Sequence, residues 1–244
     1  MTEIWIVELD KINIDVKKYM HIFSDEEIKK YHGFVREFDA ISYLKSHLLM
    51  KIILAKKISQ SIHGLNSYFY SNQYGKPYLL NGPFFSISHT NGLFAIAISD
   101  FDVGVDIENI SRNILTFEDL DFILGKAEKD FIATISDSEK DLVLLWHIWV
   151  RKESIVKALG YGLYQPLEHV VIPLKKLFFS VYQGRERFLC KEKNNLIRIM
   201  SGCQLNLPLG YVGFVVSRNL NNIRQYIFNK DYQFFDICDV LMEV

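Results

Sequence analysis

Two acidic residues, Asp106 and Glu108, flank Ile107 in a segment from Val103 that alternates like a β-strand. Residues i and i+2 of a strand point to the same face, so both carboxylates can converge on one point. Two oxygen anions on a rigid strand suit a hard cation such as Mg²⁺, which takes further ligands from water and from substrate phosphates. The spacing alone favours a simpler alternative, an ordinary solvated strand face.

A second group of candidate residues lies on a predicted helix from about Ser138 to Leu159. Trp149, Glu153 and Lys157 are four residues apart and therefore share one helix face. In a functional site, Glu153 would add a metal-binding carboxylate, and Lys157 would bind a phosphate or transfer a proton. The alternative is a surface ion pair beside a core tryptophan, which contributes only about 0.5 kcal/mol.

Two more residues can bind an anion. His89 begins the turn of a predicted hairpin, and Lys76 lies in the loop Gly75-Lys76-Pro77. The simpler alternatives are a turn histidine satisfied by the backbone and a solvated loop lysine. The sequence contains no zinc-binding histidine spacing, phosphate loop, dinucleotide fingerprint or nucleophile elbow, so those common site types are excluded.

The elements that must position these residues follow from periodicity and turn signals. Ser24-Asp-Glu-Glu27 is a capping-box pattern and predicts a short helix through Tyr31. Asn91-Gly92 between two apolar runs predicts a hairpin. The predicted strands are 4–9, 67–71, 84–88, 93–99, 103–108, 177–182, 187–190, 196–200 and 211–217, and the further helices are 38–61, 116–124, 126–134 and 138–159.

This order of elements predicts an α+β fold. Each half of the chain has one long helix and strands that look antiparallel, which indicates a pseudo-dimer of two similar halves, each a small antiparallel sheet packed on a long helix. We place the halves at residues 1–101 and 102–244. The second half carries the candidate metal site.

Composition limits the function further. The chain has 244 residues, 49% of them apolar, and a formal net charge of -1, which excludes a disordered chain and argues against a nucleic-acid binder. The three cysteines are widely spaced and predict neither a zinc site nor a dithiol motif. The N-terminal residues do not resemble a signal peptide, and no stretch approaches the ~20 apolar residues that span a bilayer. We expect a cytoplasmic protein with no membrane partner.

Taken in order, the motifs resemble those of the 4′-phosphopantetheinyl transferases. The matching segments are Gly75-Lys-Pro77, Phe85-Ser-Ile-Ser-His-Thr90, Val103-Gly-Val-Asp-Ile-Glu108 and the run from Trp149 to Gly162. The chain length is typical of the surfactin-synthetase-activating (Sfp) type, and the resemblance extends from about Ser24 to about Val216. Each motif is modest alone, whereas all four in this order are highly specific.

The resemblance implies a reaction with coenzyme A as co-substrate and Mg²⁺ as cofactor. Coenzyme A lies between the two halves, and the serine hydroxyl of an apo acyl or peptidyl carrier protein attacks its β-phosphate. The phosphopantetheine arm is transferred, and adenosine 3′,5′-bisphosphate leaves. Positive charge at the pyrophosphate fits this chemistry, because negative charge builds on the leaving group.

The resemblance also implies a role for each matched residue. The metal ligands are Asp106, Glu108, Glu153 and Glu128. The catalytic residues are Glu153, Lys157 and Glu128, where either glutamate can deprotonate the carrier serine, with Glu153 favoured, and Lys157 contacts the pyrophosphate. Trp149 packs beneath the site. The coenzyme A site is lined by Lys30, Lys76, Pro77, Ser88, His89, Lys152 and Lys157.

One position departs from the family pattern. Ser42 stands where this type usually carries an arginine that holds the 3′-phosphate, and Arg36 or Lys45 are alternative sources of positive charge. A hydroxyl in place of a guanidinium removes a charge-assisted contact, so we expect weaker binding of coenzyme A.

Two other functions stay open at this point. A non-catalytic homologue that binds carrier proteins would keep the fold, and a coenzyme A hydrolase would use water in place of the carrier serine. The resemblance implies a monomer and favours carriers of secondary metabolism, and it places the carrier surface near Phe117, Leu120 and Phe122 unless these belong to the core.

Overall fold

The structure is a computed structural model that describes residues 1–111, 116–134, 142–172, 174, 185–191, 197–220 and 222–228. Its helices are α1 (Asp25–His32), α2 (Glu37–Lys57), α3 (Phe117–Leu120), α4 (Lys126–Ala133) and α5 (Leu142–Leu159). Its strands are β1 (Thr2–Glu8), β2 (Phe69–Ser71), β3 (Pro77–Leu79), β4 (Phe84–Thr90), β5 (Leu93–Ser99), β6 (Val103–Asn109), β7 (Arg185–Lys191), β8 (Ile197–Gln204), β9 (Tyr211–Ser217) and β10 (Ile223–Phe228).

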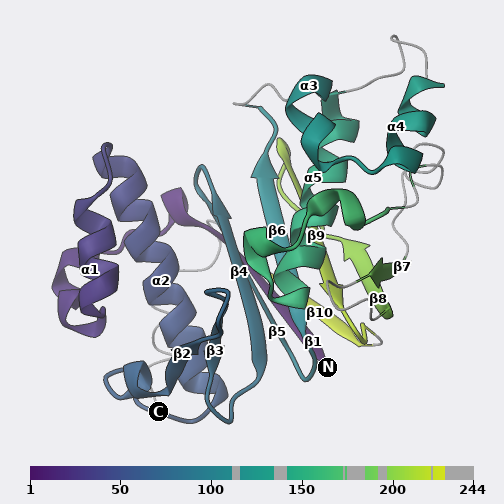
Figure 1. Cartoon of the computed structure of the whole chain (residues 1–244). Helices are drawn as coiled ribbons and strands as arrows, with labels where there is room; N and C mark the ends of the chain where they lie inside the picture. Colours follow the sequence, from purple (N-terminus) through teal and green to yellow (C-terminus); the bar gives the residue numbers. More distant parts are fainter. Residues whose placement is uncertain are drawn as a thin grey trace.

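The α+β class predicted from the sequence is confirmed. One four-stranded sheet has the order β10-β1-β5-β4, a second has the order β6-β9-β8-β7, and β2 and β3 form a small separate hairpin. The second sheet is antiparallel throughout its described pairs. In Figure 1, α1 and α2 lie beside β4 and the first sheet, while α5 lies against β6 and β9.

Local signals fix the first half. The Ser24 hydroxyl accepts a hydrogen bond from the Glu27 amide, and the Glu27 carboxylate accepts one from the Ser24 amide, so the predicted capping box begins α1. The Asn91-Gly92 turn joins β4 and β5, as predicted. α2 buries Leu44, Leu48 and other apolar residues against β4 and β5.

A separate core lies between the two sheets. Ile4 and Ile6 of β1 and the small apolar residues of β5 pack with Val103, Val105 and Ile107 of β6. Val103, Val105 and Ile107 of β6 are therefore buried between the sheets. The even residues, including Asp106 and Glu108, face α5.

β4 and β6 lie side by side without a backbone ladder, because each is the edge strand of its own sheet. The Ser86 hydroxyl accepts a hydrogen bond from the Val105 amide at 3.1 Å, and the Ser88 hydroxyl accepts one from the Ile107 amide at 3.3 Å. Serine side chains thus satisfy the buried amides at the edge of β6, because a buried N–H group without a partner would be costly.

One feature of the first sheet corrects the expectation that both sheets are antiparallel. β10 pairs in parallel with β1, from Thr2 opposite Ile223 to Val7 opposite Phe228. No local sequence pattern predicts this pairing, because it joins the two ends of the described chain and leaves β10 only partly buried. A strand from beyond residue 101 thus completes the first sheet, and the division into 1–101 and 102–244 stays a prediction.

Other boundaries differ modestly from the predictions. The predicted helix over 116–124 is shorter, because α3 ends at Leu120 and a 3-10 turn follows. The predicted strand 177–182 and the predicted start of the long helix at Ser138 lie outside the described residues. Among the described helices, none is both long and apolar enough to cross a membrane.

Candidate active site

β6 and α5 meet closely enough to join their polar side chains because Gly104 lies between them. A Cβ atom built on Gly104 would lie 1.9 Å from the Ser154 carbonyl oxygen and 2.4 Å from the Ala158 amide nitrogen. These are backbone atoms, so only glycine fits this position. The close approach brings Asp106, two residues further along β6, against the Lys157 side chain.

Asp106 lies at the centre of the site and is 4% exposed. Its Oδ1 atom accepts a hydrogen bond from the Ser88 hydroxyl at 2.9 Å and from the Lys157 ammonium at 2.7 Å. Its Oδ2 atom is buried and accepts no hydrogen bond from the described residues. Buried carboxylate oxygens are normally satisfied, so this atom fits a further positively charged ligand.

Two more carboxylates lie near Asp106. Burial and repulsion from Asp106 raise the pKa of Glu108 to about 7. The same two causes, burial first, raise the pKa of Glu153. Burial is the larger cause of both shifts and repulsion from Asp106 the second, and a bound cation would lower both pKa values.

The carboxylates do not amount to a complete metal cage. Within the described residues, no group of three or more His, Cys, Asp or Glu side chains forms a ready metal-binding cluster. Mg²⁺ is usually held by one or two carboxylates with water and substrate phosphate as the other ligands. The unpartnered oxygen of Asp106 beside Glu108 fits that kind of site.

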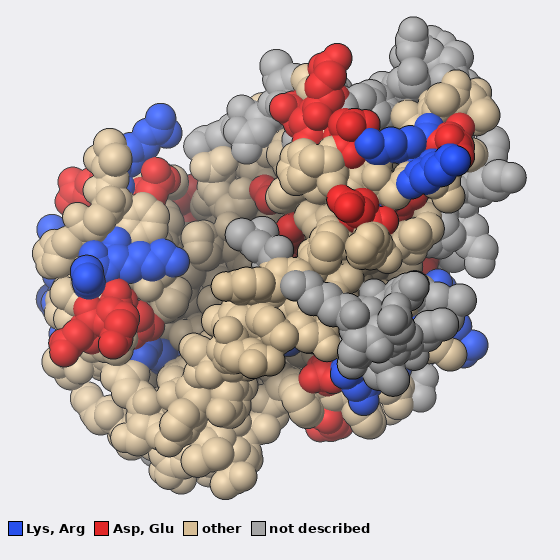
Figure 2. Space-filling model, in the orientation of Figure 1, with Lys and Arg blue, Asp and Glu red and all other residues tan. Residues whose placement is uncertain are grey.

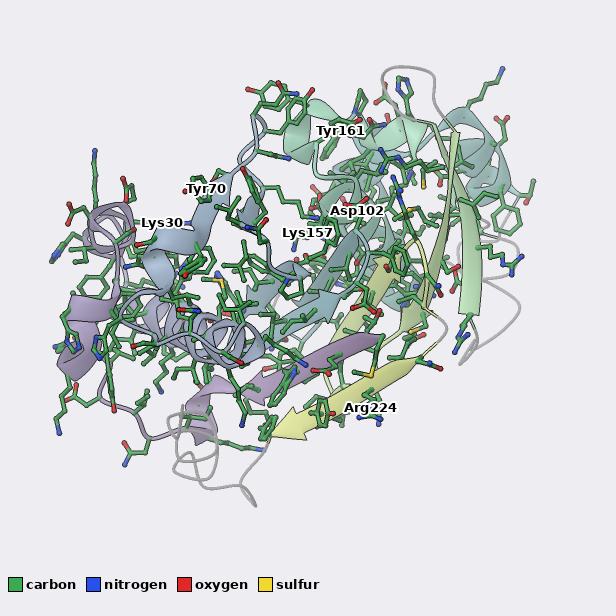
Figure 3. All side chains as sticks on the ribbon, turned by 90° about the horizontal axis from the view of Figure 1, so that it is seen from below. Lys30, Tyr70, Asp102, Lys157, Tyr161 and Arg224 are labelled. Carbon is green, nitrogen blue, oxygen red and sulfur yellow. The ribbon has the colours of Figure 1, made fainter. Side chains whose placement is uncertain are left out.

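Positive charge gathers on the other side of Asp106. Desolvation of the His89 ring, together with the charges of His47, Lys157 and Lys30, lowers the pKa of His89 to about 4. Lys30 also lies over the Tyr43 ring at 4.9 Å. In Figure 3, Lys157 lies between the two halves, with Lys30 on the side of the N-terminal helices. This concentration of positive charge suits an anion.

Pockets open around these residues. A pocket of about 230 Å³ holds Ser42 and His89, and one of about 220 Å³ holds Lys76, Pro77 and Lys157. A larger pocket of about 470 Å³ lies between α2 and the β2–β3 hairpin and also reaches Pro77. A fourth, of about 380 Å³, is lined by Phe122, Glu153 and Lys157. Lys157 therefore borders two pockets.

Lys76 binds backbone carbonyl groups, whereas the sequence predicted a residue that binds an anion. Its ammonium donates to the Val103 carbonyl at 3.0 Å and to the Ala158 carbonyl at 3.4 Å, and burial lowers its pKa to about 8. The neighbouring Asn72 amide donates to the Gly160 carbonyl at 2.8 Å. The loop of the first half thus caps the C-terminal end of α5. Pro77 lines the pockets beside it.

The structure does not bring Glu128 and Lys152 to this site, which corrects the sequence prediction for both. Lys152 has no exposed side-chain surface, and its ammonium donates to Glu128 Oε2 at 2.7 Å and to the carbonyls of Leu167 and Val170. Glu128 is 1% exposed. Its oxygens also accept from the backbone amides of Gly125 and Ile172, at 2.8 Å each. This closed pair joins α4, α5 and the following loop.

Ser42 lies where the departure from the family pattern was expected to matter. Its side chain lines the same pocket as His89. The Lys45 ammonium donates to the carbonyls of Leu9 and Ile12, at 2.9 Å each, so it is already engaged away from that pocket. Of the two alternative cations, the structure therefore disfavours Lys45.

Thr90 was missed as a site residue from the sequence, and Trp149 has a polar contact that was not predicted. The Trp149 indole N–H donates to Glu108 Oε1 at 3.3 Å, and the Thr90 hydroxyl donates to Glu108 Oε2 at 3.4 Å. Trp149 was expected only to pack beneath the site. The alternation Ser86, Ser88, Thr90 was the available signal, because three hydroxyls at a spacing of two share one strand face.

Comparison with known proteins agrees with this geometry. Residues 102–198 match the family model of the 4′-phosphopantetheinyl transferase superfamily. The chain is 29% identical over 177 residues to 4′-phosphopantetheinyl transferase gsp of Aneurinibacillus migulanus, covering 71% of this chain and 73% of that protein. It is 27% identical over 161 residues to 4′-phosphopantetheinyl transferase Sfp of Bacillus subtilis strain 168, covering 65% and 69%. The matched region contains the whole of β6 and α5, and together with these relatives it supports a similarity of this chain to the Sfp-type 4′-phosphopantetheinyl transferases.

Proposed function

We propose that this chain transfers the 4′-phosphopantetheine arm of coenzyme A to a serine of an apo acyl or peptidyl carrier protein. The observation that carries the proposal is the environment of Asp106. One oxygen binds Lys157 and Ser88, the other is buried with no partner among the residues that the structure describes, and two carboxylates with raised pKa values lie beside it. A pyrophosphate with a divalent cation matches both the positive and the negative parts of this group.

Coenzyme A would bind across β4. Pro77, His89 and Lys157 each line at least one of the three pockets around that strand. We place the pyrophosphate at Ser88, His89 and Lys157, with Lys30 adding positive charge from α1. The nucleotide would extend toward the pockets that contain Pro77 and Ser42.

Mg²⁺ would be held by Asp106 and Glu108, with Glu153 next to them. When bound, it would neutralise negative charge on the pyrophosphate and its leaving group. The unpartnered Asp106 Oδ2 atom and the raised pKa of Glu108 support this assignment.

Glu153 would serve as the base. Its carboxylate lines the same pocket as Lys157, where it can take a proton from a hydroxyl group that enters that pocket. The serine hydroxyl would lose its proton to Glu153 as its oxygen bonds to the β-phosphorus. The bond from that phosphorus to the bridging oxygen breaks, and adenosine 3′,5′-bisphosphate leaves. Lys157 would stabilise the charge on that leaving group from its place beside Asp106.

The carrier would approach the pocket next to Glu153. Phe122 lines this pocket and is 66% exposed, whereas Leu120 is fully buried in the core. The Phe117 side chain lies outside the described part. Figure 2 shows acidic side chains gathered over α3. Phe122 is therefore the part of the predicted carrier patch that we retain.

The same proposal covers the organisation of the chain. The two sheets, each covered by one long helix, support a pseudo-dimer of two similar halves that acts as a monomer. We propose a cytoplasmic location, where coenzyme A and carriers of secondary metabolism are available.

Intact mass spectrometry tests the reaction. Apo carrier protein is incubated with this protein, coenzyme A and Mg²⁺, with an EDTA control and with both a fatty-acid and a peptidyl carrier. We expect a metal-dependent gain of one phosphopantetheinyl group, which Asp106→Ala abolishes. Release of adenosine 3′,5′-bisphosphate without any carrier would indicate a hydrolase instead. Binding of carrier without a mass gain would indicate the non-catalytic homologue.

A further inference from the structure

The two carboxylates of β6 are held by the same two neighbouring elements. Glu108 accepts one hydrogen bond from Thr90, in β4, and one from Trp149, in α5. Asp106, two residues earlier, accepts one from a hydroxyl of β4 and one from a nitrogen of α5 as well. Each carboxylate thus receives one donor from β4 and one from α5, but both donors of Asp106 bind its Oδ1 atom, whereas those of Glu108 bind different oxygens.

The repeat follows from strand geometry. The hydroxyl donors of β4 are residues 88 and 90, and their acceptors on β6 are residues 106 and 108. Side chains two residues apart recur about every 6.6 Å on either strand, so two adjacent strands can form two equivalent pairs. Trp149 lies two helical turns before Lys157 on the same face of α5, so the helix supplies both nitrogen donors.

We infer that Thr90 and Trp149 are positioning residues, which fix the Glu108 carboxylate in the orientation that binds the metal. The inference rests on the proposed function. The terminal torsion of a glutamate side chain has broad minima and does not define an orientation by itself. Two donors that bind two different oxygens, one from each side, remove that freedom.

Both donors also leave Glu108 able to bind a cation. Each carboxylate oxygen has two lone pairs, and each Glu108 oxygen receives one of these two hydrogen bonds. A lone pair on each oxygen therefore remains available. Groups that orient a metal ligand in this way typically contribute 10- to 100-fold to metal affinity. The two distances are long for hydrogen bonds, so we expect the lower end of that range.

Two substitutions remove the donors with little change of shape. Thr90→Val replaces the hydroxyl by a methyl group, and Trp149→Phe removes the indole N–H while keeping an aromatic ring. Thr90→Ser keeps the hydroxyl and is the rescue variant. Trp146→Phe is the matched control, because Trp146 is buried in the core of the second half on the same helix.

The experiment measures Mn²⁺ binding to each protein by electron paramagnetic resonance, with and without coenzyme A, and does not depend on turnover. We expect Thr90→Val and Trp149→Phe to weaken Mn²⁺ binding about tenfold each. We expect Thr90→Ser and Trp146→Phe to bind Mn²⁺ like the wild type. The Mg²⁺ concentration that half-saturates transfer should rise by the same factor, while transfer at saturating Mg²⁺ recovers.

Unchanged Mn²⁺ affinity in both donor variants would overturn the inference, as would equal losses in Thr90→Ser and Thr90→Val. In those cases, wild-type transfer would still stand and the proposed function would survive. A wild-type protein that transfers nothing to either carrier yet binds Mn²⁺ in the expected order of variants would instead refute the proposed function alone.

Discussion

A comparison of Lys152 with Lys157 tests which of the two lysines is structural and which is catalytic. We predict that Lys152→Met destabilises the protein strongly, while Lys157→Met destabilises it less and removes transfer. The two lysines lie five residues apart on α5 and both bind a carboxylate at 2.7 Å. They differ in burial, because Lys152 is fully buried and the Lys157 side chain is 30% exposed.

The magnitude follows from what Lys152→Met leaves behind. The Glu128 carboxylate, 1% exposed, would lose its only ion-pair partner among the described residues and keep two backbone donors. The carbonyls of Leu167 and Val170 would lose their lysine donor as well. Breaking a buried ion pair from one side costs about 3–5 kcal/mol. For a domain of this size, that lowers the melting temperature by roughly 6–20 °C.

Urea unfolding followed by circular dichroism measures the loss, and the mass-spectrometric assay measures transfer by the folded fraction. The double variant Lys152→Met/Glu128→Leu should recover most of the stability, because replacing both partners of a buried pair is often nearly neutral. A Lys152→Met protein that unfolds at the wild-type urea concentration but transfers nothing would refute this reasoning. Such a result would indicate that Lys152 acts in the active site, as the sequence predicted.

Three further predictions follow from the site. The pKa of Glu108 is about 7 in the folded protein, against an ordinary value of 4.5, so the folded metal-free protein holds a proton on Glu108 more tightly than the unfolded chain does. The protonated Glu108 therefore contributes to stability fully below about pH 4.5, and this contribution is lost as the pH rises through 7. Urea unfolding in EDTA should therefore show a flatter pH dependence for Glu108→Gln over that interval, and an unchanged slope would contradict the shift. Ser42→Arg should tighten coenzyme A binding about tenfold, because it adds a charge-assisted contact in the pocket that contains His89. Calorimetric titration should show no gain for 3′-dephospho-coenzyme A, and clearly weaker binding of coenzyme A would rule out this role of position 42. Gly104→Ala should lower the free energy of unfolding by about 1–3 kcal/mol and slow transfer, because the new methyl group would clash with the Ser154 carbonyl. A variant as stable in urea as the wild type would contradict this close approach.

The parts of the fold predicted well are those with strong local patterns. The Ser24 capping box, the Asn91-Gly92 hairpin and the alternation of β6 each depend on residues within a few positions of one another. β10 was missed because its pairing with β1 connects distant parts of the chain. No local pattern specifies a parallel partner that lies so far away in sequence.

The candidate site shows the same limit. Asp106 and Glu108 were predicted correctly to share a face, because strand periodicity is rigid. Lys152 and Glu153 were assigned to one site, but adjacent helical residues point about 100° apart, so Lys152 faces the interior while Glu153 faces the pocket. Burial of the Glu128–Lys152 pair depends on how α4 packs on α5, which the sequence pattern does not reveal.

The parallel pairing of β10 with β1 also has a consequence for biosynthesis. β1 leaves the ribosome long before β10, so the edge of β1 that pairs with β10 has no partner until residues 223–228 have been made. At 5–20 residues per second, that interval is on the order of 10–40 s. During this time, the bare edge of β1 is available to other nascent chains. A fragment that ends at residue 101 would keep this exposed edge permanently, so we expect it to self-associate unless a copy of β10 is supplied.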